Sequence, residues 1–157
     1  MLTAIFVFEH IFYLMSTTPK AVQATTNESK IRLIALFVLI LTTTYIFTNL
    51  LIIPVFLLAD FGLRAFDLGK FSPLALISET LVKALHLPIK PVYLPPKRFA
   101  ARIGLLFSVA IVALQLFSVP TLPVSGVLAF FAALESLLGF CAGCYVFSFL
   151  QQLKVIK

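Results

Sequence analysis

Residues 31–47 read IRLIALFVLILTTTYIF, a stretch in which Arg32 is the single charged residue and most side chains are aliphatic or aromatic. A continuous apolar run of about this length is typical of a helix that crosses a bilayer. Its three threonines can bond back to the backbone of their own helix, so their hydroxyl groups tolerate an apolar environment. The stretch therefore predicts a transmembrane helix over residues 31–47.

The composition of the whole chain is that of an integral membrane protein. Hydrophobic residues make up 61% of its 157 residues and charged residues 11%, and the mean hydropathy is +1.11. A soluble domain of this size could not bury so much apolar surface. The length allows one domain of at most about four spans. We attribute the net charge of +6 to basic loops rather than to a nucleic-acid-binding face, so no nucleic-acid partner is expected.

Three further apolar segments predict an all-α fold of four transmembrane helices in an antiparallel bundle. The additional spans are expected at about residues 50–66, 98–117 and 124–150. The connection between the second and third spans carries most of the charge, and its apolar stripe predicts an interfacial helix at about residues 73–86, along the membrane surface. Small residues in the last segment favour close packing of neighbouring backbones. We expect one membrane domain over residues 28–157.

Residues 1–27 are interpreted as an extension outside this domain. They are apolar but too short to span, and they lack the basic leader of a cleaved signal peptide. Two interpretations stay open: the extension is an interfacial helix, or it is an artefact of the translation start, which would be Met15 instead of Met1.

The positions of lysine and arginine predict the orientation of the chain. All twelve lie before or at the start of the first span, around the long second connection or after the last span, and the two other connections carry none. Cytoplasmic loops of membrane proteins carry an excess of basic residues. Both termini and the long connection are therefore expected in the cytoplasm.

Charged residues on the cytoplasmic half of the bundle form a candidate site. Asp60 and Arg64 close the second predicted span, and Arg98 and Arg102 open the third. Glu135 lies within the fourth, where a carboxylate is costly unless it pairs inward. We expect Glu135 to pair with Arg102 or Arg64, or to accept a proton.

The cations Lys97, Arg98 and Arg102 open a predicted helix, where the helix dipole disfavours positive charge. A nearby negative charge is therefore expected to offset their positive charge. Two explanations stay open: contact with lipid phosphates, or an anion site formed together with free backbone amides.

Cys141 and Cys144 lie three residues apart within the predicted fourth span. On one helix their thiols would share a face, within reach of a disulfide or of a shared soft metal ion. Because the cytosol keeps thiols reduced, a cytoplasmic pair is not expected to persist as a structural disulfide. Buried free cysteines also serve as packing, so spacing alone does not decide their role.

Three hypotheses about function follow from these residues. The leading one is a thiol-redox or sulfur-handling membrane protein, with Cys141 and Cys144 as the reactive residues and nearby arginines binding an anionic partner or substrate. The second is soft-metal transport or relay, against which the scarcity of Met and His counts. The third is a non-catalytic membrane subunit in which Asp60 and Arg64 form a structural ion pair. The sequence predicts no resident cofactor or metal site and leaves open whether the protein is an enzyme.

Four blocks of the sequence carry a family resemblance: DFGLRAF (60–66), SPLALISETLVKAL (72–85), KPVYLPPKRFAARIG (90–104) and LESLLGFCAGCYVF (134–147). In this order, over about residues 28–150, they resemble a bacterial membrane family catalogued as domain of unknown function 4395. The resemblance rests on Asp60, Phe61 and Arg64, on residues 96–104 with Ala101 at the variable place, and on Cys141, Gly143 and Cys144.

The resemblance implies a protein of the bacterial cytoplasmic (inner) membrane and marks these positions without supplying a reaction. The analogy with small four-helix membrane proteins of thiol metabolism is one of fold and motif. A thioredoxin-like or sulfurtransferase protein is the partner expected for a thiol-redox role, in addition to the lipid bilayer.

Overall fold

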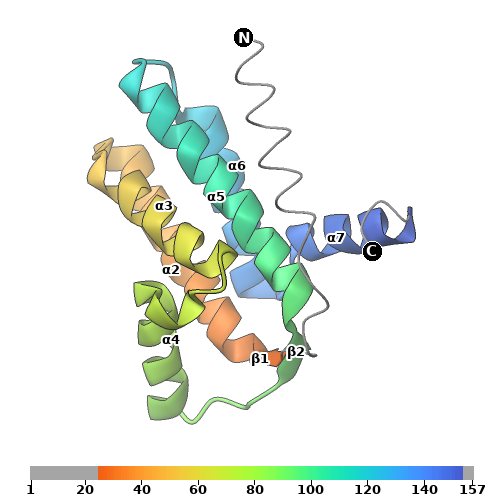
Figure 1. The fold of residues 1–157 in the computed structure, drawn as a ribbon. Helices are drawn as coiled ribbons and strands as arrows, with labels where there is room; N and C mark the ends of the chain where they lie inside the picture. The colour runs from red at the N-terminus through yellow and green to blue at the C-terminus, as the bar shows by residue number, and fades with distance from the viewer. Residues whose placement is uncertain (1–24, 154–157) are drawn as a thin grey trace.

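The computed structural model describes residues 25–153, which form a helical bundle with one short pair of strands (Figure 1). The two interpretations of the N-terminal extension fall almost entirely on residues 1–24, outside the described residues. The same holds for the last basic residues of the chain.

Helix α2, Glu28–Thr48, contains the first predicted span. It begins three residues earlier than expected because Asn27 caps it, its side chain accepting the N–H of Ser29 at 3.1 Å. Glu28 in the first turn adds a negative charge at the positive end of the helix dipole. The helix ends at Thr48, and the capping residue Asn49 has a φ of 51°, the left-handed conformation common at helix ends.

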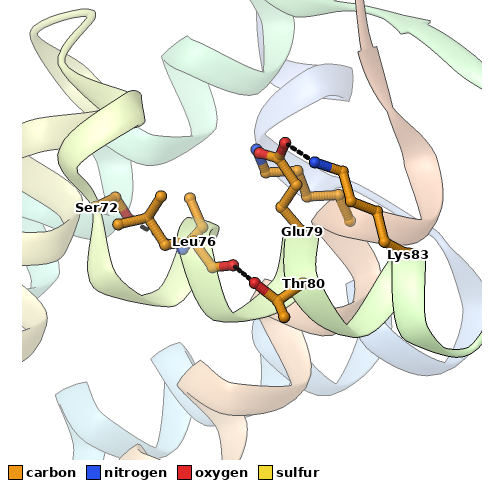
Figure 2. A network of polar contacts seen from close by, with 7 residues as sticks. Ser72, Leu76, Glu79, Thr80 and Lys83 are labelled. Carbon is orange, nitrogen blue, oxygen red and sulfur yellow. Dashed lines mark hydrogen bonds and ion pairs between the residues drawn. The ribbon is translucent and has the colours of Figure 1, made fainter.

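Helix α3, Ile52–Ala65, runs back along the bundle and corresponds to the second predicted span. A short 3-10 turn, Gly69–Phe71, leads to helix α4, Pro73–Ala84, where the surface helix was expected. Ser72 caps α4, and proline suits the first turn because its missing N–H breaks no helical bond. Figure 2 shows α4 from close by, with the bond from Thr80 to the Leu76 carbonyl and the ion pair between Lys83 and Glu79.

Two short strands hold the starts of two helices together. Strand β1, Thr25–Asn27, pairs antiparallel with β2, Pro91–Tyr93, and the strands lead directly into α2 and α5. Helix α5, Leu94–Leu116, begins four residues before the predicted third span because prolines 95 and 96 fit its first turn. The starts of α2 and α5 therefore lie at the same end of the molecule (Figure 1).

The prediction of one continuous helix over residues 124–150 is wrong. Helix α6, Leu122–Ala133, continues as a π-helical turn, Leu134–Leu138, and helix α7, Ala142–Gln152, then leaves at an angle of 94° (Figure 1). Gly139 causes the break, since its φ of 67° ends the first helix. The Arg32 guanidinium fills the space where a Cβ at residue 139 would stand, with its Nε 3.0 Å away.

Within residues 25–153, α2 and α5 are long and apolar enough to cross a membrane, and the α6–α7 pair adds a third candidate if it counts as one bent span. The expectation of an all-helical protein with candidate membrane spans is confirmed. Helix α3 has 14 residues and rises about 21 Å, less than the thickness of a typical hydrocarbon core.

The core forms where α3 packs on α5 and α2 packs on α6, with α4 against α2 and α7 against α5. At one end, the buried Tyr45 donates to Gln115 at 2.9 Å or to Thr121 at 3.0 Å. The strands, α4 and the starts of α2 and α5 lie at the opposite end (Figure 1), and these segments carry most of the charged residues among those the structure describes. This charged end contains the residues marked by the sequence.

Candidate functional site

The cysteine pair lies at the start of a helix rather than within one. Cys141 is the N-cap of α7, and its Sγ accepts the backbone N–H of Cys144 at 3.3 Å. Both thiols are free; Cys141 is 6% exposed and Cys144 is half-buried. A helix N-terminus presents unpaired N–H groups and a partial positive charge, which stabilise a thiolate. The break at Gly139 creates this arrangement.

Gly143 lets α7 approach α5 closely beside the cysteines. A Cβ at this position would lie 2.7 Å from the Cβ of Ala100 and 2.8 Å from its Cα. One turn further along, the rings of Phe99 and Phe147 pack with centroids 5.6 Å apart. The glycine between the two cysteines therefore has a packing role: it fixes the pair against the first half of α5.

An ion pair between Lys97 and Glu135 lies next to the cysteines. The Nζ of Lys97 is 2.8 Å from Oε1 of Glu135, and these side chains are 15% and 20% exposed. The Lys97 ammonium also interacts electrostatically with both cysteine side chains. The first turns of α5 bring Lys97 to the π-helical turn, so the cation paired with Glu135 is Lys97, in place of the expected Arg64 or Arg102. The sequence indicates only that Glu135 needs a cation at the same depth in the membrane as its own carboxylate.

A cavity of about 200 Å³ lies between α2, α3, α5, α6 and the start of α7. Its walls are mostly aliphatic and aromatic, and its polar or reactive side chains are Arg64, Glu135 and Cys141. Cys144 is not part of its lining. The two cysteines thus have different surroundings, one at a cavity wall and one outside it.

A second cavity, of about 410 Å³, lies on the charged side of the first and shares Arg64 with it. Basic residues dominate its charged lining: Lys30, Arg64, Lys70, Lys97 and Arg98, against Asp67 and Glu79. Its two carboxylates are engaged in ion pairs. Hydrogen bonds from Lys30 and Lys83 lower the pKa of Glu79 to about 2, and the Lys30 bond, at 2.8 Å, ties α2 to α4.

Asp60 has a structural position. It is fully buried, and its Oδ1 accepts the hydroxyl of Ser72 and, at 3.2 Å, the N–H of Leu74, so it supports the cap of α4. Its Oδ2 lies 3.6 Å from Nη1 of Arg64, whose guanidinium stacks over the Phe61 ring. Asp60 therefore joins α3 to α4, and Arg64, on the same helix, lines the cavities.

Carboxylates compensate the cations at the start of α5. Lys97 pairs with Glu135, and Arg98 pairs with Asp67 of the long connection. Two prolines in the first turn have no N–H to offer, which weakens the expectation of an anion site built on backbone amides. Arg102 follows one turn later, is partly buried and lines neither cavity. The structure thus gathers Cys141, Cys144, Glu135, Lys97 and Arg64 and leaves the other predicted residues around them.

A family model described as Domain of unknown function (DUF4395) matches residues 26–152, a range that includes every residue of this site. The chain belongs to the DUF4395 family. The resemblance seen in the four sequence blocks is thereby confirmed. Comparisons with curated proteins and with solved structures give no match.

The site of this DUF4395 protein offers two kinds of chemistry. Its thiol pair at a helix start suits nucleophilic attack and disulfide exchange. Its Lys97–Glu135 pair holds a proton donor and an acceptor beside the sulfur atoms. Among residues 25–153, no group of three or more His, Cys, Asp or Glu side chains is arranged to hold a metal ion.

Proposed function

We propose that this DUF4395 protein is a membrane protein of the bacterial cytoplasmic membrane whose Cys141 and Cys144 cycle between dithiol and disulfide. The observation that carries the proposal is the position of Cys141. Its sulfur caps α7, accepts the N–H of Cys144 and lies at the wall of a cavity. A helix start favours thiolate, the form that attacks and leaves in disulfide exchange. Here the contact with Cys141 lowers the pKa of Cys144, whereas the same contact and burial raise the pKa of Cys141.

The proposal places four helical segments in the membrane: α2, α3, α5 and the combined segment Leu122–Leu138. The last rises about 25 Å, and together with the short α3 it suits a locally thin bilayer. Large apolar side chains on the outside of the bundle support lipid contact, among them Phe47, Ile52 and Phe117, which are 82%, 73% and 78% exposed. Helices α4 and α7 would lie at the interface, since α7 leaves the bundle at 94°.

The charged end of the bundle faces the cytoplasm in this arrangement. The described basic residues lie at that end, with the starts of α2 and α5, whereas the opposite end carries the uncharged contacts of Tyr45. The positive-inside rule then puts both chain termini and the cysteine pair on the cytoplasmic side.

A thioredoxin-like or sulfurtransferase protein fits as the partner in exchange. Starting from the Cys141–Cys144 disulfide, a partner thiolate attacks the sulfur of Cys144, forms an intermolecular disulfide and releases Cys141 as a thiolate. A second partner thiolate then attacks the partner's own sulfur in that bond, which releases Cys144 as a thiolate. The partner ends as a disulfide, and two electrons have passed to the cysteine pair; the reverse steps return them.

The half-buried Cys144 is the sulfur that a protein partner can approach, and attack on it makes the buried Cys141 the leaving group. The released Cys141 thiolate gains the N–H of Cys144 and the field of the Lys97 ammonium. Glu135 holds that ammonium in place at 2.8 Å. In this proposal Cys144 meets the partner, Cys141 leaves, Lys97 stabilises the thiolate and Glu135 positions Lys97.

An aromatic disulfide that releases a coloured thiolate tests the proposal. Reduced wild-type protein should release two equivalents and end lighter by two hydrogen atoms, because the second cysteine resolves the first adduct. Cys141→Ser and Cys144→Ser should each release one equivalent and retain one adduct, and the double variant none. Wild-type protein that retains two adducts, or that does not react, would show that the cysteines act separately or only as packing.

A further inference from the structure

The smaller cavity has a polar end and an apolar end. Arg64, Glu135 and Cys141 lie at the charged end of the bundle. Along α2 the lining runs from Ile31 to Val38, about 10 Å by helical rise. Apolar residues of other helices complete the walls, among them Ile103, Phe107, Leu128 and Phe131. A molecule in this cavity would meet hydrocarbon on most sides and a thiol at one end.

The volume and lining limit what the cavity can hold. An engineered apolar cavity of about 150 Å³ takes up benzene, so a cavity of about 200 Å³ has room for one substituted ring. The mostly carbon lining disfavours a charged peptide or a phosphorylated molecule, because polar groups need partners when they leave water. The ligand class indicated is a flat, uncharged, single-ring molecule that dissolves in the bilayer.

We infer that this cavity binds the ring of a membrane-soluble quinone, which accepts the two electrons of the Cys141–Cys144 dithiol. The inference rests on the proposed thiol exchange and names its electron acceptor. Cys141, the sulfur at the cavity wall, reacts with the quinone, and the more accessible Cys144 reacts with the protein partner. The two cysteines thus have different surroundings because each reacts with a different molecule.

The redox step balances with the quinone alone. The Cys141 thiolate adds to a ring carbon and forms a C–S bond, and the Cys144 thiolate then attacks the sulfur of Cys141. The S–S bond forms while the C–S bond breaks, and its electron pair stays on the ring. The disulfide is the oxidised product and the hydroquinone the reduced one, and the two protons of the thiols end on the two ring oxygens.

Glu135 is placed to carry protons in this step. Glu135 lines the smaller cavity, whereas Lys97, bonded to it at 2.8 Å, lines the larger cavity with its charged groups. A proton that leaves a thiol can therefore reach Glu135 and return to a ring oxygen. Lys97 acts in this step as a positioning residue for the carboxylate.

The test uses the full chain, reduced, in lipid nanodiscs, with a short-tailed benzoquinone substituted at all four ring carbons so that it leaves no lasting thiol adduct. We expect loss of quinone absorbance, one disulfide per quinone consumed, and a rate that saturates with quinone concentration. Ala132→Leu and Ala35→Leu each fill the cavity from a different helix. Each should slow quinone reduction by at least about tenfold. Each should leave the reaction with the aromatic disulfide unchanged, and far-UV circular dichroism checks that the variant is folded.

Val127→Leu is the matched control, because Val127 lies on the same helix as Ala132 but is 42% exposed, and it should behave as wild type. If the aromatic disulfide oxidises the pair and the quinone does not, the quinone inference is wrong and thiol exchange stands. If neither oxidises it, both proposals are wrong. A quinone reaction that does not saturate, or that both cavity-filling variants leave unchanged, would also overturn the inference.

Discussion

Replacing Asp60 by alanine should destabilise the protein by about 3 kcal/mol. The Asp60 side chain is 0% exposed; it accepts two hydrogen bonds, from Ser72 and from the Leu74 N–H, and it lies 3.6 Å from the Arg64 guanidinium. One hydrogen bond to a charged group contributes about 1.5–3 kcal/mol, and removing one partner of a buried ion pair costs about 3–5 kcal/mol. We take the lower end because the Arg64 side chain stays 18% exposed and regains some hydration.

Unfolding by SDS in mixed micelles, followed by far-UV circular dichroism, measures this loss. Asp60→Asn keeps an oxygen for Ser72 and Leu74 and removes the charge, so its loss should lie between those of wild type and Asp60→Ala. Asp67→Ala is the matched control, because its carboxylate is 59% exposed in its pair with Arg98 and should contribute at most about 1 kcal/mol. An Asp60→Ala loss no larger than that of Asp67→Ala would refute a structural role for the buried carboxylate.

Three further predictions concern the cysteine site and helix α4. Gly143→Ala should cost about 1–3 kcal/mol by forcing α7 off α5, whereas Gly126→Ala, with open space at its Cβ, should cost nothing; unfolding in micelles compares them. Lys97→Gln should move the pH midpoint of cysteine alkylation upward by roughly 1 unit, and Glu135→Gln should move it downward, because one removes a cation and the other an anion near the thiols; shifts of the same sign would contradict this. Glu79 has a pKa of about 2 in the folded protein against 4.5 for the free group, so its stabilising effect is present above about pH 5 and lost toward pH 2. The stability difference between wild type and Glu79→Gln should shrink over that window, and a constant difference would be inconsistent with the Lys30 bond.

The helical segments were predictable from apolar runs and caps. Asn27 and Ser72 stand at the starts of α2 and α4, where short polar side chains favour helix initiation. The start of α5 was missed because the prolines before Lys97 suit both an extended strand and a first helical turn. The boundary depends on the pairing of β2 with β1, a contact between distant parts of the chain.

The break in the last predicted span was the larger error, and it changed the site. An uninterrupted apolar run predicts one helix, and Gly139 alone is compatible with a helix interior. What decides the break is tertiary: the Arg32 side chain from α2 covers the glycine, and Cys141 caps the next helix. The sequence placed both cysteines on one helical face, whereas the fold gives them different surroundings.

The sequence predicts that Glu135 pairs with a cation, but it does not predict which lysine or arginine that cation is. Glu135 needed a cation from another helix, and several cations open α5 at the matching depth. Choosing Lys97 over the nearby arginines requires the rotation of α5 about its axis and the position of the π-helical turn. One sequence does not fix either of these quantities.

The most direct test of the thiol-exchange account is a redox titration of the purified protein in glutathione buffers, with the disulfide between Cys141 and Cys144 counted by mass spectrometry. The account predicts one reversible two-electron transition, from a dithiol to a species lighter by two hydrogen atoms, with a midpoint between about −180 and −320 mV. Two thiols that never pair, or that form only separate glutathione adducts across this range, would contradict it.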